Sequence, residues 1–309
     1  MRRLASLAVV SLMVASACGS SGAAPRPATA RISAHVHAGS GPCALAEAGG
    51  RVWITGYNDG TLTALDLASG KVVRTVHVGG TPCGVAAAAG RLWVARLGAR
   101  DVAEVDPHTG ATIRRIPVHG QVWDVEAEGT AVWLSNRTGG TVERLDATTG
   151  RLVATIPVGS MPGGLAIAAG AVWVANSGDG TVSRIDPSTD RVTGSVRLDH
   201  PSPTWFAPAG RWLWVTNADN TATEIDTTRR AVARTIQAGP APRDPDSDGH
   251  TLWMPDGGDG QLLLLRADDG ARVGAIRLLP GIFVAAHVAG ATWVLNYSSD
   301  DVWRLVAQP

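Results

Sequence analysis

Short apolar segments alternate with polar, glycine-bearing turns along most of this chain. The pattern is clearest in residues 159–198, which read GSMPGGLAIAAGAVWVANSGDGTVSRIDPSTDRVTGSVRL. Apolar runs of about four to eight residues, bounded by glycine, proline, asparagine and aspartate, are typical of strands joined by tight turns. The segments LAIAA, AVWVAN, TVSRID and RVTGSVRL therefore predict four consecutive short strands.

The same four-strand unit recurs along the chain, and tryptophan marks its period. One tryptophan falls every 39 to 41 residues, at Trp53, Trp93, Trp133, Trp173, Trp214, Trp253 and Trp293. A period of about 40 to 45 residues with four strands is the signature of β-propeller blades. Each tryptophan lies between apolar neighbours, where a large ring can fill the space between adjacent blades. We therefore predict an all-β, seven-bladed β-propeller with four antiparallel strands per blade.

The two ends of the chain indicate how the ring closes. After the last of these tryptophans, the segment DVWRLVAQP is long enough for a third strand but not for a fourth. Residues 30–38, ARISAHVHA, match the fourth-strand pattern KVVRTVHV of residues 71–78. Because an unpaired edge strand invites aggregation, we expect the N-terminal strand to complete the seventh blade. The propeller then spans residues 31–309.

The first 30 residues have the composition of an export signal followed by a linker. Two arginines precede an apolar run over residues 4–14, and small residues lead directly into Cys18. This is the build of a secretory signal over residues 1–17, and it resembles the lipobox of bacterial lipoproteins, in which the cysteine is acylated. Residues 18–30 are small, polar and proline-bearing, as in a flexible tether. We expect an exported protein held on the extracytoplasmic side of the cell membrane through Cys18 alone, with cleavage and release as a soluble protein as the alternative.

Charge narrows the range of partners. The formal net charge at pH 7 is +0, so nothing in the composition attracts nucleic acid electrostatically. We expect a monomer whose partner is a small molecule, a glycan or another protein.

The repeat also carries a family resemblance. The segment VWVANSGDGTVSRIDPSTDRVTGSVRL resembles the YVTN-repeat, YncE-like family of β-propellers, whose repeat runs Tyr-Val-Thr-Asn, a glycine-rich turn and a strand ending in Ile-Asp. All seven repeats show some of this pattern, most clearly the fourth. The resemblance implies the fold strongly and an activity weakly, because propellers host many unrelated functions.

A more distant similarity, to the virginiamycin B lyases, implies an enzyme. Their repeats typically read Trp-Phe-Thr-Glu where this chain reads VWVAN, VWLSN or LWVTN. Asparagine replaces the acid at Asn136, Asn176, Asn217 and Asn296. The sequence contains no His-Glu-x-x-His, Cys-x-x-Cys or EF-hand motif. We expect no cofactor, no metal and no catalytic residues, with a lyase or hydrolase of this type as the alternative.

One aspartate-rich segment and two cysteines leave alternatives open. Residues 243–249, RDPDSDG, are interpreted as a solvated loop, with a calcium site as the alternative. Cys43 and Cys83 occupy the same position in the first two repeats, so their backbones are expected about 6 to 7 Å apart, at the limit for a disulfide. Export permits oxidation, and the alternatives are a bridge or two buried free thiols.

Departures from the repeat point to a site on one face of the ring. Where the fourth strand of one blade connects to the first strand of the next, large or charged residues replace small ones at Trp123, Asp124, Trp205, Arg243, Asp244 and Phe283. The turns between second and third strands share that face and add Tyr57, Arg96, Arg137, Asp256 and Tyr297. Aromatic rings, arginines and carboxylates around one funnel are the usual makeup of a binding site.

We therefore predict a binding module that uses the funnel. An enzyme using the same face would need an acid–base pair, for which Asp124, Asp244, Asp246 and His200 are the candidates. A structural role through the edges of the blades is the third possibility.

Overall fold

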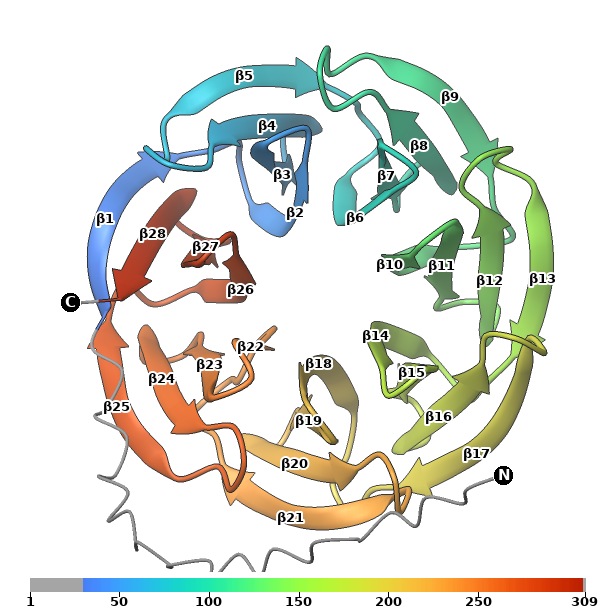
Figure 1. The fold of residues 1–309 in the computed structure, drawn as a ribbon, viewed down its shortest axis with the longest axis vertical. Coiled ribbons are helices and arrows are strands. Elements are labelled where there is room, and N and C mark those ends of the chain that lie inside the picture. Colours follow the sequence, from blue (N-terminus) through green and yellow to red (C-terminus); the bar gives the residue numbers. More distant parts are fainter. Residues whose placement is uncertain (1–29, 308–309) are drawn as a thin grey trace, which may run out of the picture.

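The computed structural model of the protein describes residues 30–307; the predicted signal sequence and Cys18 lie outside the described residues. Seven sheets of four antiparallel strands surround a central axis (Figure 1), so the predicted seven-bladed propeller is confirmed. Within six blades the strands follow chain order from the axis to the circumference. No helix in the described part of the chain could span a membrane.

The strand bounds follow the repeat. Blade 1 contains β2 (Pro42–Ala48), β3 (Arg51–Gly56), β4 (Thr61–Asp66) and β5 (Val72–His77), and blade 2 contains β6 (Pro82–Ala88), β7 (Arg91–Arg96), β8 (Asp101–Val105) and β9 (Thr112–Pro117). Blade 3 contains β10 (Val122–Glu128), β11 (Ala131–Asn136), β12 (Thr141–Asp146) and β13 (Leu152–Pro157), and blade 4 contains β14 (Pro162–Ala168), β15 (Ala171–Asn176), β16 (Thr181–Asp186) and β17 (Arg191–Arg197). Blade 5 contains β18 (Pro203–Ala209), β19 (Trp212–Asn217), β20 (Thr221–Asp226) and β21 (Ala231–Gln237), and blade 6 contains β22 (Asp246–Ser247), β23 (Thr251–Asp256), β24 (Gln261–Arg266) and β25 (Arg272–Arg277). Blade 7 contains β26 (Ile282–Val288), β27 (Ala291–Asn296), β28 (Asp301–Ala307) and β1 (Ala30–His37).

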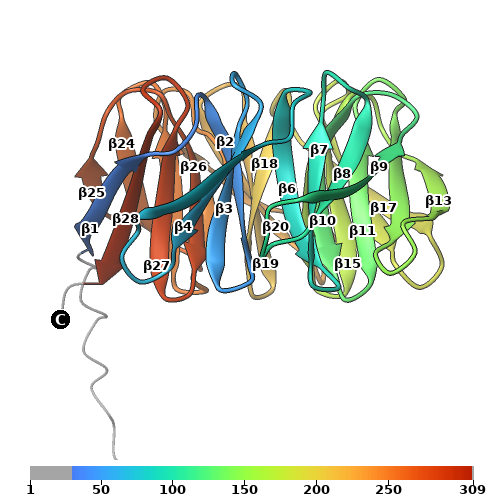
Figure 2. The same ribbon diagram turned by 90° about the horizontal axis from the view of Figure 1, so that it is seen from above.

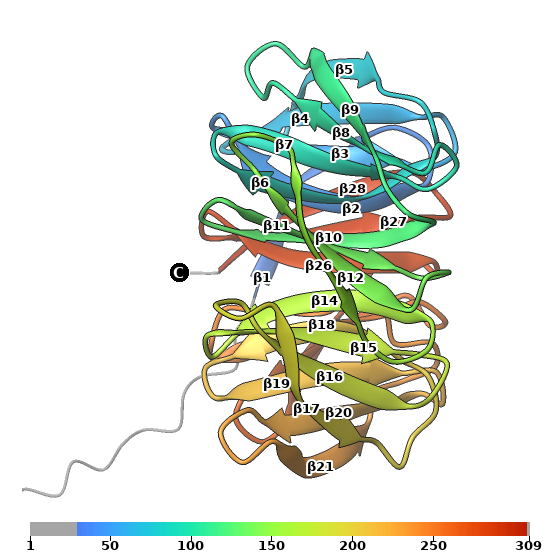
Figure 3. The same cartoon turned by 90° about the vertical axis from the view of Figure 1, so that its right-hand side faces the viewer.

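Figures 2 and 3 show the ring from its edge. The innermost strands run across its thickness, and the outermost strands are strongly inclined to them because each sheet twists. The ends of the innermost strands therefore rim a central channel on both faces of the ring.

The repeated tryptophans form the core between blades, as predicted. Their residual exposure is 5% or less. Trp93 of blade 2 packs in one cluster with Val125 and Leu134 of blade 3, and Trp133 of blade 3 packs with Leu165 of blade 4. Each ring thus buries apolar surface of the following blade, and truncating such a tryptophan typically costs about 3 to 5 kcal/mol.

The ring closes as expected from the two chain ends. Strand β1 pairs antiparallel with β28, from Ala30 opposite Ala307 to His37 opposite Asp301. His35 Nε2 lies 2.6 Å from Asp301 Oδ1, and its ring stacks on Trp303 at 5.3 Å between centroids. Strand pairing and side-chain contacts together join the first described residues to the last.

Blade 6 departs from the regular repeat at the axis. Its innermost strand β22 has only two residues, Asp246 and Ser247, although the repeat predicts a full strand. Pro245 lacks the backbone N–H that a regular ladder requires, and only isolated bridges remain there, including Asp244 to Val284 of blade 7. The irregular backbone places two acidic residues beside the channel.

Candidate functional site

A funnel opens on the face where the innermost strands begin. Its cavity of about 450 Å³ is bounded by the starts of these strands and by the turns that follow the second strands. Seven of the residues predicted for the site line it: Tyr57, Trp123, Arg137, Trp205, Arg243, Phe283 and Tyr297. Cavities of roughly 300 to 1,000 Å³ are typical of small-molecule sites.

Five aromatic rings form a continuous wall in this funnel. Trp123 stacks on Trp205 with 6.1 Å between ring centroids, and Trp205 meets Phe283 edge-on at 5.8 Å. Phe283 lies 6.0 Å from Tyr297, which in turn lies 6.0 Å from Tyr57. These rings come from blades 3, 5, 7 and 1, so residues far apart in sequence present one apolar surface. We call this set of five rings the aromatic wall.

Two arginines lie over rings of the aromatic wall. The Arg137 guanidinium is 4.7 Å from the centroid of the Trp123 ring, and that of Arg243 is 6.0 Å from the centroid of Phe283. Burial lowers the pKa of Arg137. Both side chains line the funnel, where they offer donors for a polar group of a ligand.

A disulfide strengthens the funnel on the side of blades 1 and 2. Cys43 and Cys83 are bonded, with 5.1 Å between their Cα atoms, and both line the cavity. The backbones are thus closer than the 6 to 7 Å expected from the repeat, and the bridge is formed. It fixes the starts of β2 and β6 relative to one another.

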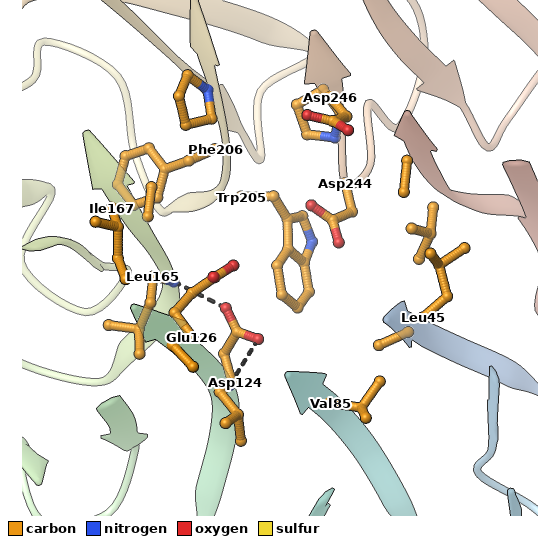
Figure 4. A pocket seen from close by; sticks show the side chains of 18 of the residues that line it. Leu45, Val85, Asp124, Glu126, Leu165, Ile167, Trp205, Phe206, Asp244 and Asp246 are labelled. Carbon is orange, nitrogen blue, oxygen red and sulfur yellow. Dashed lines mark hydrogen bonds between the residues drawn. The ribbon is translucent and has the colours of Figure 1, made fainter. Parts of the chain in front are cut away.

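Below the funnel the channel forms a second cavity, also of about 450 Å³. Asp124 and Asp244, which we expected at the funnel rim, line this deeper cavity instead, together with Glu126 and Asp246. We call these four side chains the channel carboxylates. Figure 4 shows Trp205 projecting between Asp244 on one side and the two acids of β10 on the other. Trp205 lines both cavities and so connects them.

Glycines in the preceding blades make room for the large residues at the axis. A Cβ at Gly84 would lie 2.9 Å from the backbone nitrogen of Val125 and 3.0 Å from the Cα of Asp124. A Cβ at Gly164 would lie 3.2 Å from the Cα of Trp205. A glycine in one blade therefore allows the next blade to approach closely and present a large side chain to the channel.

Two of the channel carboxylates also join neighbouring blades. Asp124 accepts hydrogen bonds from the backbone N–H of Val125 at 2.8 Å and of Leu165 in blade 4 at 2.9 Å. Asp246 accepts from Ser247 at 2.7 Å and from His287 in blade 7 at 2.6 Å. Such bonds favour the charged form, but burial outweighs them and raises the pKa of both Asp124 and Asp246. Each of these side chains bridges two blades through its hydrogen bonds.

The other two channel carboxylates lack such support. No ion pair joins the Asp244 or Glu126 carboxyl group to a basic residue within 30–307, and neither group accepts a hydrogen bond from a neighbouring blade there. Glu126 is supported by the backbone N–H of the adjacent Ala127. Burial raises the pKa of Glu126 to about 8, and the charges of Asp124 and Asp246 add to that rise. Burial and the other three acids raise the pKa of Asp244 well above its usual value. Glu126 therefore binds a proton near neutral pH.

The geometry of the channel carboxylates does not match a metal centre. Within residues 30–307, no three His, Cys, Asp or Glu side chains converge closely enough to hold a metal ion. The RDPDSDG segment instead divides its acids, since Asp244 and Asp246 face the channel while Asp248 is exposed and caps a turn through the N–H groups of His250 and Thr251. This arrangement does not match the calcium alternative.

Arg96 and Asp256 do not reach the funnel. Each follows its repeat tryptophan by three residues, and the side chains that line the funnel follow it by four. Arg96 is buried, donates to the Gly79 carbonyl at 3.1 Å and pairs with Asp101 at 3.2 Å. Asp256 accepts from the N–H groups of its own turn, the role that Asn296 has in blade 7. Both are structural turn residues.

The position of one further candidate, His200, excludes it from the channel. His200 pairs with Asp219 at 2.7 Å on the rim and does not line either cavity, so it forms no acid–base pair with the channel carboxylates. Glu126 was not among the predicted site residues. Its signal was present in the repeat alignment, because five of the other six blades hold alanine at this position and only blade 6 holds another acid, Asp246.

Solved structures confirm the architecture. No protein-family model and no curated protein matches the sequence. A structure described as streptogramin B lyase matches with a TM-score of 0.77 and 16% identity over 91% of this chain and 98% of the other. This similarity establishes a common fold. Virginiamycin B lyase from Staphylococcus aureus (TM-score 0.76, 15% identity, 90% and 99% covered) and BamB from Moraxella catarrhalis (0.68, 14%, 90% and 98%) match in the same way.

Proposed function

We propose that this protein is an exported, lipid-anchored binding module that recognises a small organic ligand through its funnel. The aromatic wall carries the proposal. Five rings that border a cavity of about 450 Å³ leave apolar surface in contact with water, and a ligand that covers it gains the free energy of burying that surface.

The covalent and hydrogen-bonded contacts around the rings support a preformed site. The disulfide between Cys43 and Cys83 fixes one side of the funnel, and interblade hydrogen bonds of Asp124 and Asp246 fix the channel beneath it. A ligand that binds to such a preformed site loses little binding free energy to ordering of the protein. The disulfide is also consistent with an oxidising compartment outside the cytoplasm.

The test is whether a small molecule is retained through the aromatic wall. We expect the protein purified from its native envelope to release a small organic molecule on denaturation, detected by mass spectrometry. The Trp123→Ala variant should lose it, while Trp212→Ala, which removes a ring that lines neither cavity, should retain it. Equal retention by Trp123→Ala and the unmodified protein would refute the funnel as the site, and recovery of a protein or glycan instead would redirect the assignment of the ligand.

A second candidate is an enzyme that uses the same face. The pKa of about 8 for Glu126 favours this candidate, because a carboxyl group that titrates near neutral pH suits general acid–base catalysis. Incubating the released ligand with fresh protein distinguishes the two. Conversion of the ligand that Glu126→Gln abolishes would indicate an enzyme, and recovery of unchanged ligand would indicate binding alone.

A further inference from the structure

We propose that the ligand is an amphipathic organic cation, with its protonated amine among the channel carboxylates and its apolar part against the aromatic wall. This inference rests on the proposed function and specifies the chemical class of the ligand. It follows from the combination of the two cavities, which differ in chemistry and meet at Trp205.

The deeper cavity has acidic groups with no basic partner. The four channel carboxylates line it together with the exposed Glu128 at the end of β10, and no lysine or arginine of the described chain lines it or forms an ion pair with any of these five acids. Uncompensated acids at a partly buried position destabilise the protein unless something neutralises them. An ammonium group that enters the channel supplies the missing positive charge and hydrogen-bond donors.

The spacing of the acids favours an organic cation over a metal ion. The acids come from blades 3 and 6, on either side of Trp205 (Figure 4), and they do not converge on one point as metal ligands do. An alkylammonium group can donate to acids around it, and the face of the Trp205 ring adds a favourable contact with a positive charge. The cavity of about 450 Å³ has room for such a group with water.

The arginines orient the ligand. Arg137 and Arg243 line the funnel but not the deeper cavity, so positive charge lies at the outer end and negative charge at the inner end. A ligand therefore gains the most binding free energy when its amine points inward, toward the acids, and the other end of the molecule lies near the arginines.

Binding of a cation is expected to release protons. The pKa of about 8 means that Glu126 holds a proton in the free protein near neutral pH, and the pKa of Asp244 is raised in the same direction. The charged or titratable groups that act on the channel carboxylates are the four acids themselves, His287 and Asp248, and Glu128 lines the same cavity. An ammonium ion stabilises the ionised carboxylates, so its binding and their deprotonation are linked.

Three probes with one ring and different charges test this inference. 2-Phenylethylamine, 2-phenylethanol and 3-phenylpropionate are titrated into the protein at pH 7 and low salt by calorimetry. We expect the amine to bind about tenfold more tightly than the alcohol, and the carboxylate to bind least. Heats measured in two buffers of different ionisation enthalpy should show proton release with the amine and none with the alcohol.

Neutral variants of the acids provide the decisive comparison. The double variant Glu126→Gln/Asp244→Asn should reduce the preference for the amine to about twofold or less while retaining the alcohol, and Asp244→Asn alone serves if the double variant does not fold. Glu47→Gln/Asp199→Asn removes two exposed carboxylates elsewhere and should leave the preference unchanged. Equal binding of amine and alcohol, or a preference that persists in the double variant, would overturn this inference and leave the funnel as a binding site. Failure of all three probes to bind at millimolar concentration would count against the proposed function as well.

Discussion

Replacing Glu126 with glutamine tests the electrostatics of the channel in the free protein. The folded chain holds a proton on this carboxyl group up to a pKa of about 8, whereas the group in the unfolded chain has a pKa near the ordinary 4.5. At a pH between these two pKa values, the carboxyl group is ionised in the unfolded chain and protonated in the folded chain. Stability therefore falls as pH rises from about 4.5 to about 8, and we expect glutamine to abolish this contribution.

The size of the stability gain follows from the difference between the two pKa values. Each pKa unit corresponds to about 1.36 kcal/mol, so 2.5 units between pH 4.5 and pH 7 set an upper limit of about 3.4 kcal/mol. Water in the channel screens the partly buried side chain, which reduces the expected gain to about 1 to 3 kcal/mol at pH 7. The gain should vanish near pH 4.5 and level off above pH 8.

The assay is urea unfolding of Glu126→Gln and of the unmodified protein at half-unit steps from pH 4.5 to pH 8.5. Glu47→Gln is the control, because it removes an exposed carboxylate from an innermost strand, β2, without touching either cavity. We expect the free-energy difference to grow with pH for Glu126→Gln and to remain flat for the control. A difference independent of pH, or a destabilised Glu126→Gln variant, would refute the argument that this acid is buried without a basic partner.

Three further predictions concern the core, the disulfide and the anchor. Trp214→Phe should destabilise the protein by about 1 to 3 kcal/mol more than Trp93→Phe in urea unfolding, because the Trp214 indole N–H donates to a backbone carbonyl at 2.9 Å and that of Trp93 has no partner within residues 30–307; equal costs would contradict this. Replacing both Cys43 and Cys83 with serine should lower the free energy of unfolding by about 3 to 4 kcal/mol, because the bridge closes a loop of 40 residues. If the unmodified protein is equally stable with and without reductant, no bridge forms. Cys18→Ser should move the protein from the membrane fraction to the medium, and an unchanged distribution would argue against lipidation.

The positions of Arg96 and Tyr57 show where prediction of the site reached its limit. Both belong to turns on the funnel face, and the repeat places both there. Arg96 follows its repeat tryptophan by three residues and Tyr57 follows its own by four. Side chains at neighbouring positions of a strand face opposite sides. Tyr57 consequently enters the funnel, while Arg96 turns back toward Asp101 within its own blade. Sorting the turn residues by their distance from the repeat tryptophan would have separated these two groups.

The sequence by itself determined the seven blades, their order and the closing strand, because each of these depends on local strand patterns and on a period that tryptophan marks. Only the tertiary structure decided that the acids of blades 3 and 6 share one channel with Trp205, and that Cys43 and Cys83 are close enough to bond. These contacts depend on the radius of the ring and on the irregular backbone of blade 6. Both arise from how whole blades pack, which no single repeat encodes.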